Sequence, residues 1–253
     1  MSSRVSGAAG HPGAPVARAA ALALVERIDP DFAVVARRAY AAAEERELTG
    51  REAALIGMVV QGNISYYDPV QMESCMRTAL EAGADVLELA KVIELTAVMG
   101  YHGVAVTVPI TLEALQSQGR LPGPGAAPRD TLRNISRSMV AEWAGAAGQM
   151  ADFARVSPEL ADLMSDWTRV AWNNDILDRK LKELIYLAFD ATPTHIFLPG
   201  VAGHVHRCLD AGATAREIMQ VLEISVTPAM DVVGRSLHLL SEVTAGPRDP
   251  SSS

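Results

Sequence analysis

The segment LEAGADVLELAKVIEL, Leu80 to Leu95, recurs in recognisable form as LDAGATAREIMQVLEI, Leu209 to Ile224. The two segments are 209 − 80 = 129 residues apart. An internal repeat predicts the architecture ahead of any local pattern, here one helical unit used twice. Chance would give about one identity over this length, whereas identical residues occur at Leu80/Leu209, Ala82/Ala211, Gly83/Gly212, Ala84/Ala213, Glu88/Glu217, Val92/Val221 and Glu94/Glu223.

A glycine and a capping pattern explain much of this identity. Gly83 and Gly212 stand where a residue in the left-handed conformation would end a helix, which glycine does at no Cβ cost. Two residues later, Asp85-x-x-Glu88 and Thr214-x-x-Glu217 have the spacing of a capping box. We therefore predict two helix–glycine–cap–helix junctions, in which both glutamates are capping residues.

Proline and glycine divide the chain. Residues 119–130, GRLPGPGAAPRD, hold three prolines and three glycines and cannot sustain a helix. We expect a flexible tail over 1–20, a divergent first unit over 21–117, a linker over 118–130, a second, site-bearing unit over 131–244 and a flexible tail over 245–253. Periodicity and breakers predict helices at about 30–45, 49–61 and 69–82, at 158–173, 178–190 and 199–211, and after residues 83 and 214.

Composition narrows the class of protein. Apolar residues make up 49% and aromatic residues 5%, with alanine and leucine dominant, which favours packed helices. A net charge of −8 argues against nucleic-acid partners and anionic membranes. The stretch Ala19 to Val25 is too short for a membrane span and lacks a cleavage site. With only Cys75 and Cys208, the chain is predicted to be cytoplasmic with reduced thiols.

The second unit resembles a known family. The segments LDRKLKELIYLAF (177–189) and GHVHRCLDAGATAREIMQVL (203–222) are similar to the carboxymuconolactone decarboxylase family, which includes thiol-dependent alkylhydroperoxidases. Glu183, His204, the element 212–218 and the upstream Trp172 carry the resemblance. It implies an all-α fold of two tandem units built from antiparallel helix pairs. It also implies a homo-oligomer, for which a trimer of two-unit chains is favoured by analogy.

The thiol peroxidase chemistry of that family is not expected. The positions seven and four residues before His204, where peroxidase members carry a Cys-x-x-Cys pair, hold Phe197 and Gly200. Peroxide reduction of that kind needs a thiolate and a resolving thiol. In the first unit, Ala53, Ala54 and Cys75 replace the second unit's Lys182, Glu183 and His204, so we expect the proton-transfer groups in the second unit.

The resemblance implies cofactor-free acid/base chemistry on a small carboxylated or lactone-type substrate, in which His204 transfers a proton. Glu183 would orient its imidazole or act as a second base, and Lys182 or Arg179 would hold a substrate carboxylate. Decarboxylation leaves an enolate, which requires positive charge or hydrogen-bond donors at the forming oxyanion.

Two loops that precede the helices at 69–82 and 199–211 are predicted pocket walls. One loop, 190–200, carries His195 as a further catalytic candidate, and the other, 61–69, places Tyr66 at the equivalent position. Tyr66 and Trp172 are substrate-binding candidates, although an indole more often anchors packing.

Several alternatives stay open. Glu183 could form a surface ion pair with Arg179 or Lys180, and His204 could be a packed histidine. The protein could be a non-catalytic small-ligand binder. It could also be a metal enzyme using His195, His204 and Cys208, although no metal is predicted, because His204 and His206 point to different sides of a helix.

Overall fold

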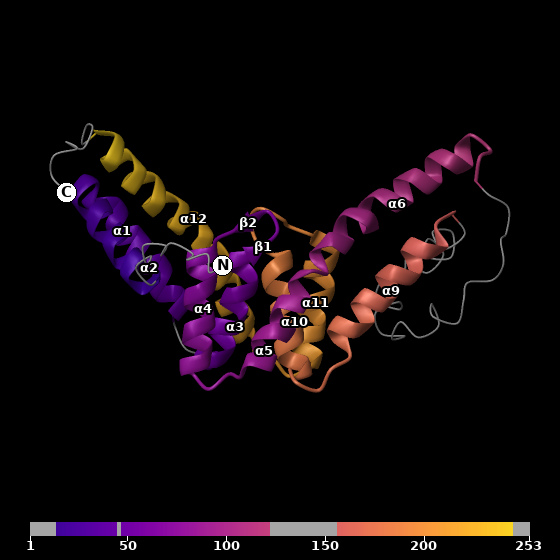
Figure 1. The fold of residues 1–253 in the computed structure, drawn as a ribbon, viewed down its shortest axis with the longest axis horizontal. Coiled ribbons are helices and arrows are strands. Elements are labelled where there is room, and N and C mark those ends of the chain that lie inside the picture. The colour runs from indigo at the N-terminus through magenta and orange to yellow at the C-terminus, as the bar shows by residue number, and fades with distance from the viewer. Residues whose placement is uncertain (1–13, 45–46, 122–155, 245–253) are drawn as a thin grey trace, which may run out of the picture.

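A computed structural model describes residues 14–44, 47–121 and 156–244. These residues are almost entirely helical, and Figure 1 shows a central group of helices from which two longer helical arms project. One short antiparallel pair joins β1 (Gly62–Asn63) to β2 (Tyr66–Tyr67). The prediction of an all-α protein is confirmed.

The helix bounds repeat at the offset seen in the sequence. Helix α3 (Gly50–Gln61) and helix α10 (Arg179–Asp190) differ by 129 residues at both ends, and so do α4 (Pro69–Glu81) and α11 (Leu198–Asp210). The duplication itself remains our interpretation of this correspondence. The other described helices are α1 (Ala14–Ile28), α2 (Pro30–Glu44), α5 (Val86–Thr96), α6 (Met99–Ser117), α9 (Pro158–Trp172) and α12 (Ala215–Thr244).

The predicted glycine and capping junctions are present in both units. Gly83 and Gly212 have φ of 93° and 89°, which a residue with a Cβ adopts only with strain. Asp85 and Glu88 form a capping box at the start of α5. At the start of α12, the Thr214 amide donates to Glu217 Oε2 at 2.6 Å, and the Glu217 amide donates to Thr214 Oγ1 at 3.1 Å.

The capping glutamates also bind equivalent basic residues. Arg51 pairs with Glu88, and Lys180 pairs with Glu217 at 2.7 Å. The two pairs are again related by 129 residues. Each ties the start of a central helix to the junction that follows, which fixes α3 against α5 and α10 against α12.

Helices α3 and α10 form the centre of the core. From Ala54 to Gln61, and from Leu181 to Asp190, every residue of these helices is buried. Helix α4 packs on α3, and α11 packs on α10. The units interlock, because α12 of the second unit packs along α1 and α2 of the first, as Figure 1 shows. Side chains from both units can therefore meet at one place.

The predicted N-terminal tail is wrong for residues 14–20, which belong to helix α1. The alanine-rich sequence favours a helix, and Arg18 anchors it to Asp231 of α12 through Nε–Oδ1 and Nη2–Oδ2 hydrogen bonds of 3.0 Å each. Residues 1–13, the linker from 122 onward, the predicted start of the second unit at 131 and the C-terminal tail lie outside the described residues.

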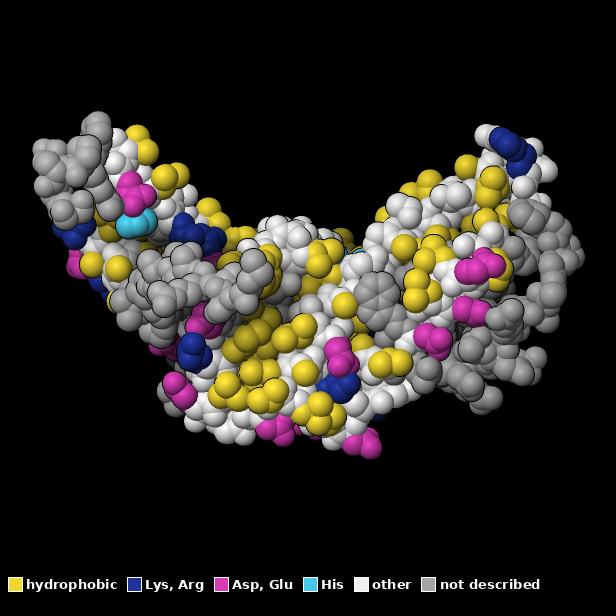
Figure 2. Space-filling view, viewed as in Figure 1, with side chains coloured by type: hydrophobic (Ala, Val, Ile, Leu, Met, Phe, Trp, Pro, Cys, Tyr) yellow, Lys and Arg dark blue, Asp and Glu magenta, His cyan; other side chains and the backbone are white. Residues whose placement is uncertain are grey.

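Within the described residues, one helical stretch, Val86–Ser117, is long and apolar enough by composition to span a membrane. Core helices of soluble proteins can have the same length and composition. The stretch is interrupted between Thr96 and Met99, and it places a buried His102 in its middle. Figure 2 shows hydrophobic side chains spread over the visible face of the molecule, and exposed apolar residues of α6 include Val106 and Ile110.

Candidate active site

The imidazole of His204 is held between two charged side chains. His204 Nδ1 lies 2.7 Å from Glu183 Oε2, and Arg207 Nε donates to the same oxygen at 2.9 Å. Glu183 is only 1% exposed, so its charge is stabilised by these partners rather than by water. The alternative of a surface ion pair with Arg179 or Lys180 is therefore wrong: Arg179 is exposed, and Lys180 binds Glu217.

The remaining contacts leave Nε2 of His204 as its reactive nitrogen. We place the Nδ1 proton toward the Glu183 carboxylate, although Arg207 Nη2 also lies 2.7 Å from Nδ1. Tyr186 stacks on the imidazole at 5.0 Å between ring centroids. Burial lowers the pKa of His204, and the hydrogen bond to Glu183 opposes that effect.

A second group of side chains lies on the Nε2 side. Asp190 Oδ2 is 3.7 Å from His204 Nε2, and Asp190 Oδ1 is 3.4 Å from His102 Nδ1. His102 Nδ1 lies 2.5 Å from His195 Nε2. The fold therefore brings His195 and His204 into one region, as we expected. It also places His102, from the first unit, beside them.

Burial disfavours the charged form of each member of this group. Asp190 is fully buried, and desolvation raises the pKa of its carboxyl to about 8. Burial, followed by the nearby His195 and His204, lowers the pKa of His102 to about 3. Burial also lowers the pKa of His195. Such opposed shifts are typical of functional sites.

Local backbone geometry positions these groups. Ile196, directly after His195, has a φ of 28°, in the region that residues with a Cβ avoid. Gly200, in the first turn of α11, leaves the space that Asp190 occupies, because a Cβ there would overlap Asp190 Oδ2 and press on Phe197. The ring of Phe197 in turn stacks on His102 at 4.0 Å.

Three predicted site residues have other partners. Lys182 donates to the carbonyls of Trp172 and Asn174 and lies over the indole of Trp172, so it does not face the cluster as a substrate cation. Trp172 packs on Tyr186, behind the His204 ring. Tyr66, in the first unit, contacts Arg235 and the Pro228 carbonyl of α12, away from the histidines.

Sequence reasoning missed Asp190, His102 and Arg207. A signal for two of them was available. Asp190 lies seven residues after Glu183, and Arg207 lies three residues after His204, spacings that place each pair on one helix face. His102 had no such signal, because it reaches the cluster from the other unit.

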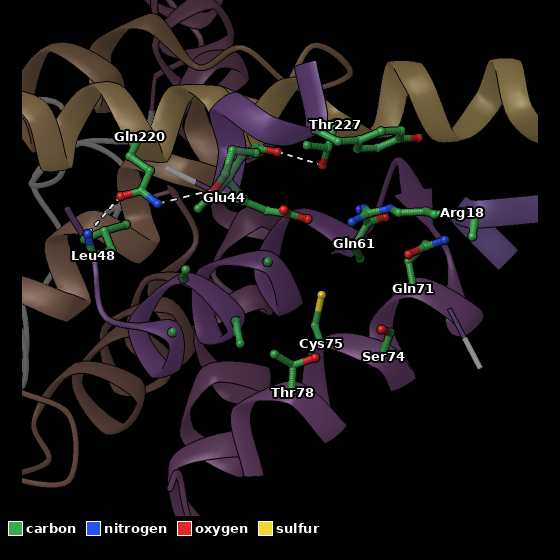
Figure 3. A pocket seen from close by; sticks show the side chains of 18 of the residues that line it. Arg18, Glu44, Leu48, Gln61, Gln71, Ser74, Cys75, Thr78, Gln220 and Thr227 are labelled. Atoms are coloured by element: carbon green, nitrogen blue, oxygen red, sulfur yellow. Dashed lines mark hydrogen bonds between the residues drawn. The ribbon is translucent and has the colours of Figure 1, made fainter. Parts of the chain in front are cut away.

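The equivalent region of the first unit is hollow. A cavity of about 640 Å³ lies there, and Figure 3 shows Ser74, Cys75 and Thr78 along one side of it. Its walls include small or uncharged residues that replace, at the offset of 129, the second unit's Glu183, Tyr186, Asp190 and His204. The replacing residues are Ala54, Gly57, Gln61 and Cys75.

A partly buried ion pair between Arg18, which lines the cavity, and Asp231 lies at one side of this cavity. Asp231, the positional equivalent of His102, accepts from Arg18, from Tyr40 at 2.8 Å and from Gln61 at 3.2 Å. Burial raises the pKa of Cys75 to about 11, which keeps that thiol protonated. The region around the first-unit cavity thus resembles the site of the second unit in arrangement. Its buried carboxylate is paired with donors, however, and no imidazole is present among the described residues that line the cavity.

Fold and cluster together define an all-α protein built of paired helices around a buried histidine–carboxylate group. Residues 158–238 match the model of the Carboxymuconolactone decarboxylase family. A crystal structure from Burkholderia xenovorans, of a protein provisionally described as a gamma-carboxymuconolactone decarboxylase subunit, superimposes with a TM-score of 0.76 at 24% identity, covering 93% of this chain and 99% of that one. No curated protein matches the chain in sequence.

Residues 158–238 are therefore similar in sequence to the carboxymuconolactone decarboxylase family, and nearly the whole chain shares the fold of the Burkholderia xenovorans structure. The family matches the second unit, which is also the unit that carries Glu183 and His204.

Proposed function

We propose that this chain is an enzyme that performs acid/base chemistry on a small carboxylated or lactone-type substrate, by decarboxylation or a related lyase or isomerase step. His204 is its proton-transfer residue. The observation that carries the proposal is the 2.7 Å contact between His204 and Glu183, both of which lie in the segment that matches the family. A buried carboxylate that orients an imidazole is a recurrent way to direct proton transfer.

Each residue of the site has a distinct task. Glu183 holds the imidazole through Nδ1, which directs Nε2 toward the reacting atoms. In decarboxylation the carbon–carbon bond breaks, carbon dioxide leaves and the electron pair passes to the enolate oxygen. His204 Nε2, which takes up a proton from solvent before the bond breaks, then gives that proton to the carbon. Arg207 donates to the Glu183 oxygen that contacts the imidazole, which keeps this carboxylate in place beside Nδ1.

The test is turnover of a panel of carboxylated lactones and β-keto acids, followed by release of carbon dioxide. His204→Gln should lower kcat by about 10²-fold or more, the usual contribution of a general acid or base. His206→Gln is the matched control, since His206 is exposed on the same helix. Equal turnover by wild type and His204→Gln, with circular dichroism showing both folded, would refute the role.

A non-catalytic ligand-binding protein is the second candidate, and the first-unit cavity favours it. Its volume of about 640 Å³ lies in the range that small-molecule sites occupy. Native mass spectrometry of the freshly purified protein would detect a retained small molecule. A retained molecule together with no turnover of any panel substrate would support binding over catalysis.

We also propose that the chain forms a homo-oligomer, as the family resemblance suggests. The exposed apolar residues of α6 give such an assembly a surface to bury. Light scattering after size-exclusion chromatography should give three times the chain mass of 26.9 kDa. A monomer at micromolar concentration would contradict this proposal.

A further inference from the structure

We propose that His102, Asp190 and His195 bind a divalent transition-metal ion at the junction of the two units. One ligand atom from each of these residues lies within 4.8 Å of the others, and two of the three residues are buried. His102 comes from α6 of the first unit, whereas Asp190 and His195 come from α10 and the loop that follows it. The site therefore requires both units.

The buried carboxylate of Asp190 supplies the first argument. Asp190 is fully buried, and neither of its oxygens accepts a hydrogen bond within the described residues. A buried carboxylate without donors is costly unless a cation or a proton compensates it. Beside the first-unit cavity, the buried Asp231 of α12 receives the guanidinium of Arg18 and two further donors. A metal ion would give Asp190 the cation that Arg18 gives Asp231.

The two imidazoles supply the second argument. His102 Nδ1 and His195 Nε2 face each other at 2.5 Å, so their lone pairs require a proton or a cation between them. Two imidazoles with one carboxylate form a ligand set for Zn²⁺, Fe²⁺ or Co²⁺, whereas Mg²⁺ and Ca²⁺ prefer oxygen ligands. With metal–nitrogen bonds of about 2.0–2.1 Å, a tetrahedral ion would hold these nitrogens about 3.4 Å apart, so the rings need to separate by about 1 Å.

This ligand set differs from the one that the sequence suggested. Cys208 is fully buried in the hydrophobic core and is not part of the cluster, and His204 lies beside the cluster rather than within it. His204 Nε2 is 3.7 Å from Asp190 Oδ2, so an ion bound to Asp190 would stand next to the proposed proton-transfer group. It would supply positive charge for an enolate oxygen.

The decisive experiment measures binding without substrate. The full chain, free of any polyhistidine tag, is stripped with a chelator, dialysed and titrated with Co²⁺ by visible absorption and with Zn²⁺ by calorimetry. We expect one ion per chain, and an increase in Tm on addition of Zn²⁺. His102→Gln and His195→Gln should each weaken Zn²⁺ binding at least tenfold. Asp190→Asn should do the same while keeping the shape of the side chain.

Matched control variants test whether other metal-binding side chains of the protein, outside the cluster, hold the ion instead. His206→Gln and Cys208→Ala should bind Zn²⁺ as the wild type does, because neither residue belongs to the cluster. Circular dichroism establishes which variants are folded, and His195→Gln, which alters a loop, decides the question if His102→Gln does not fold.

Two outcomes of the binding experiment would contradict the metal site. Absence of Zn²⁺ and Co²⁺ binding at 100 µM free ion, or unchanged affinity in His195→Gln, would overturn the metal site. Those outcomes leave the proposed acid/base function standing if His204→Gln still loses turnover. Conversely, if the protein binds Zn²⁺ tightly but His204→Gln does not change turnover, the proposed function is refuted and the metal site stands.

Discussion

Asn63 donates a hydrogen bond to Thr192 at 2.8 Å, and the two residues are 129 positions apart, so each occupies the position of the other in its own unit. Equivalent positions touch each other when two similar units face one another around a two-fold axis, as in an isologous dimer. Asn63 and Thr192 would therefore mark such an axis inside a single chain, between the cavity of the first unit and the histidine–carboxylate cluster of the second.

This contact yields a prediction about stability. Asn63 and Thr192 are both buried, and Thr192 also donates to the Phe189 carbonyl. Thr192→Val keeps the shape but removes the acceptor, which strands the Asn63 amide and should cost about 1–3 kcal/mol in the free energy of unfolding. Urea unfolding of both single variants and the double variant Asn63→Ala/Thr192→Val measures it. Strictly additive effects would contradict a shared interaction.

A second prediction concerns Glu183. Glu183→Gln keeps the side-chain volume but replaces the carboxylate that binds His204 and Arg207. We expect kcat to fall by about 10²-fold with little change in KM, because the imidazole loses its orienting partner while the other side chains of the site are retained. Steady-state kinetics on a substrate that the wild type turns over would measure both constants. A change confined to KM would instead make Glu183 a substrate-binding residue.

The sequence predicted the fold well because the determining signals are local. Three local signals determine helix ends within a few residues: glycine at the left-handed positions 83 and 212, the two capping boxes, and the prolines in the first turns of α4 and α11. The tail at 14–20 was misjudged because its anchor, Asp231, lies 213 residues from Arg18.

The site was only partly predictable for the same physical reason. Glu183 and His204 carry the family resemblance, and the structure joins them. Asp190 and Arg207 share helix faces with those residues and could have been found. His102 could not, because its place beside His195 depends on how α6 of one unit crosses α10 of the other.

A third prediction concerns the thiols. Burial raises the pKa of Cys75 to about 11 and that of Cys208 to about 12, so both thiols stay largely protonated at pH 8. Iodoacetamide should therefore modify both cysteines of the native protein at least about a hundredfold more slowly than a small-molecule thiol. Mass spectrometry would follow the modification, with protein unfolded in guanidinium as the fast-reacting control. Rapid alkylation of native Cys75 would contradict this and would reopen thiol chemistry.

The last prediction concerns Gly200, whose missing side chain leaves room for the Asp190 carboxylate. Alanine is normally the better residue inside a helix, by about 1 kcal/mol. At Gly200, however, a Cβ would overlap Asp190 Oδ2 and press on Phe197, which itself stacks on His102. Asp190 is fully buried and cannot swing into solvent, so the added methyl should push the carboxylate toward the imidazoles. We expect Gly200→Ala to lower the free energy of unfolding by about 1–3 kcal/mol, the usual cost of overpacking.

Gly103→Ala is the matched control for that substitution. Gly103 is an exposed helical glycine with open space around its Cβ position, so alanine there should stabilise the protein slightly. Opposite signs for the two glycine substitutions in urea unfolding would separate helix propensity from the clash with Asp190. If Gly200→Ala stabilises the protein as much as Gly103→Ala does, the carboxylate has room to move, and the close packing of Asp190 against the start of α11 is wrong.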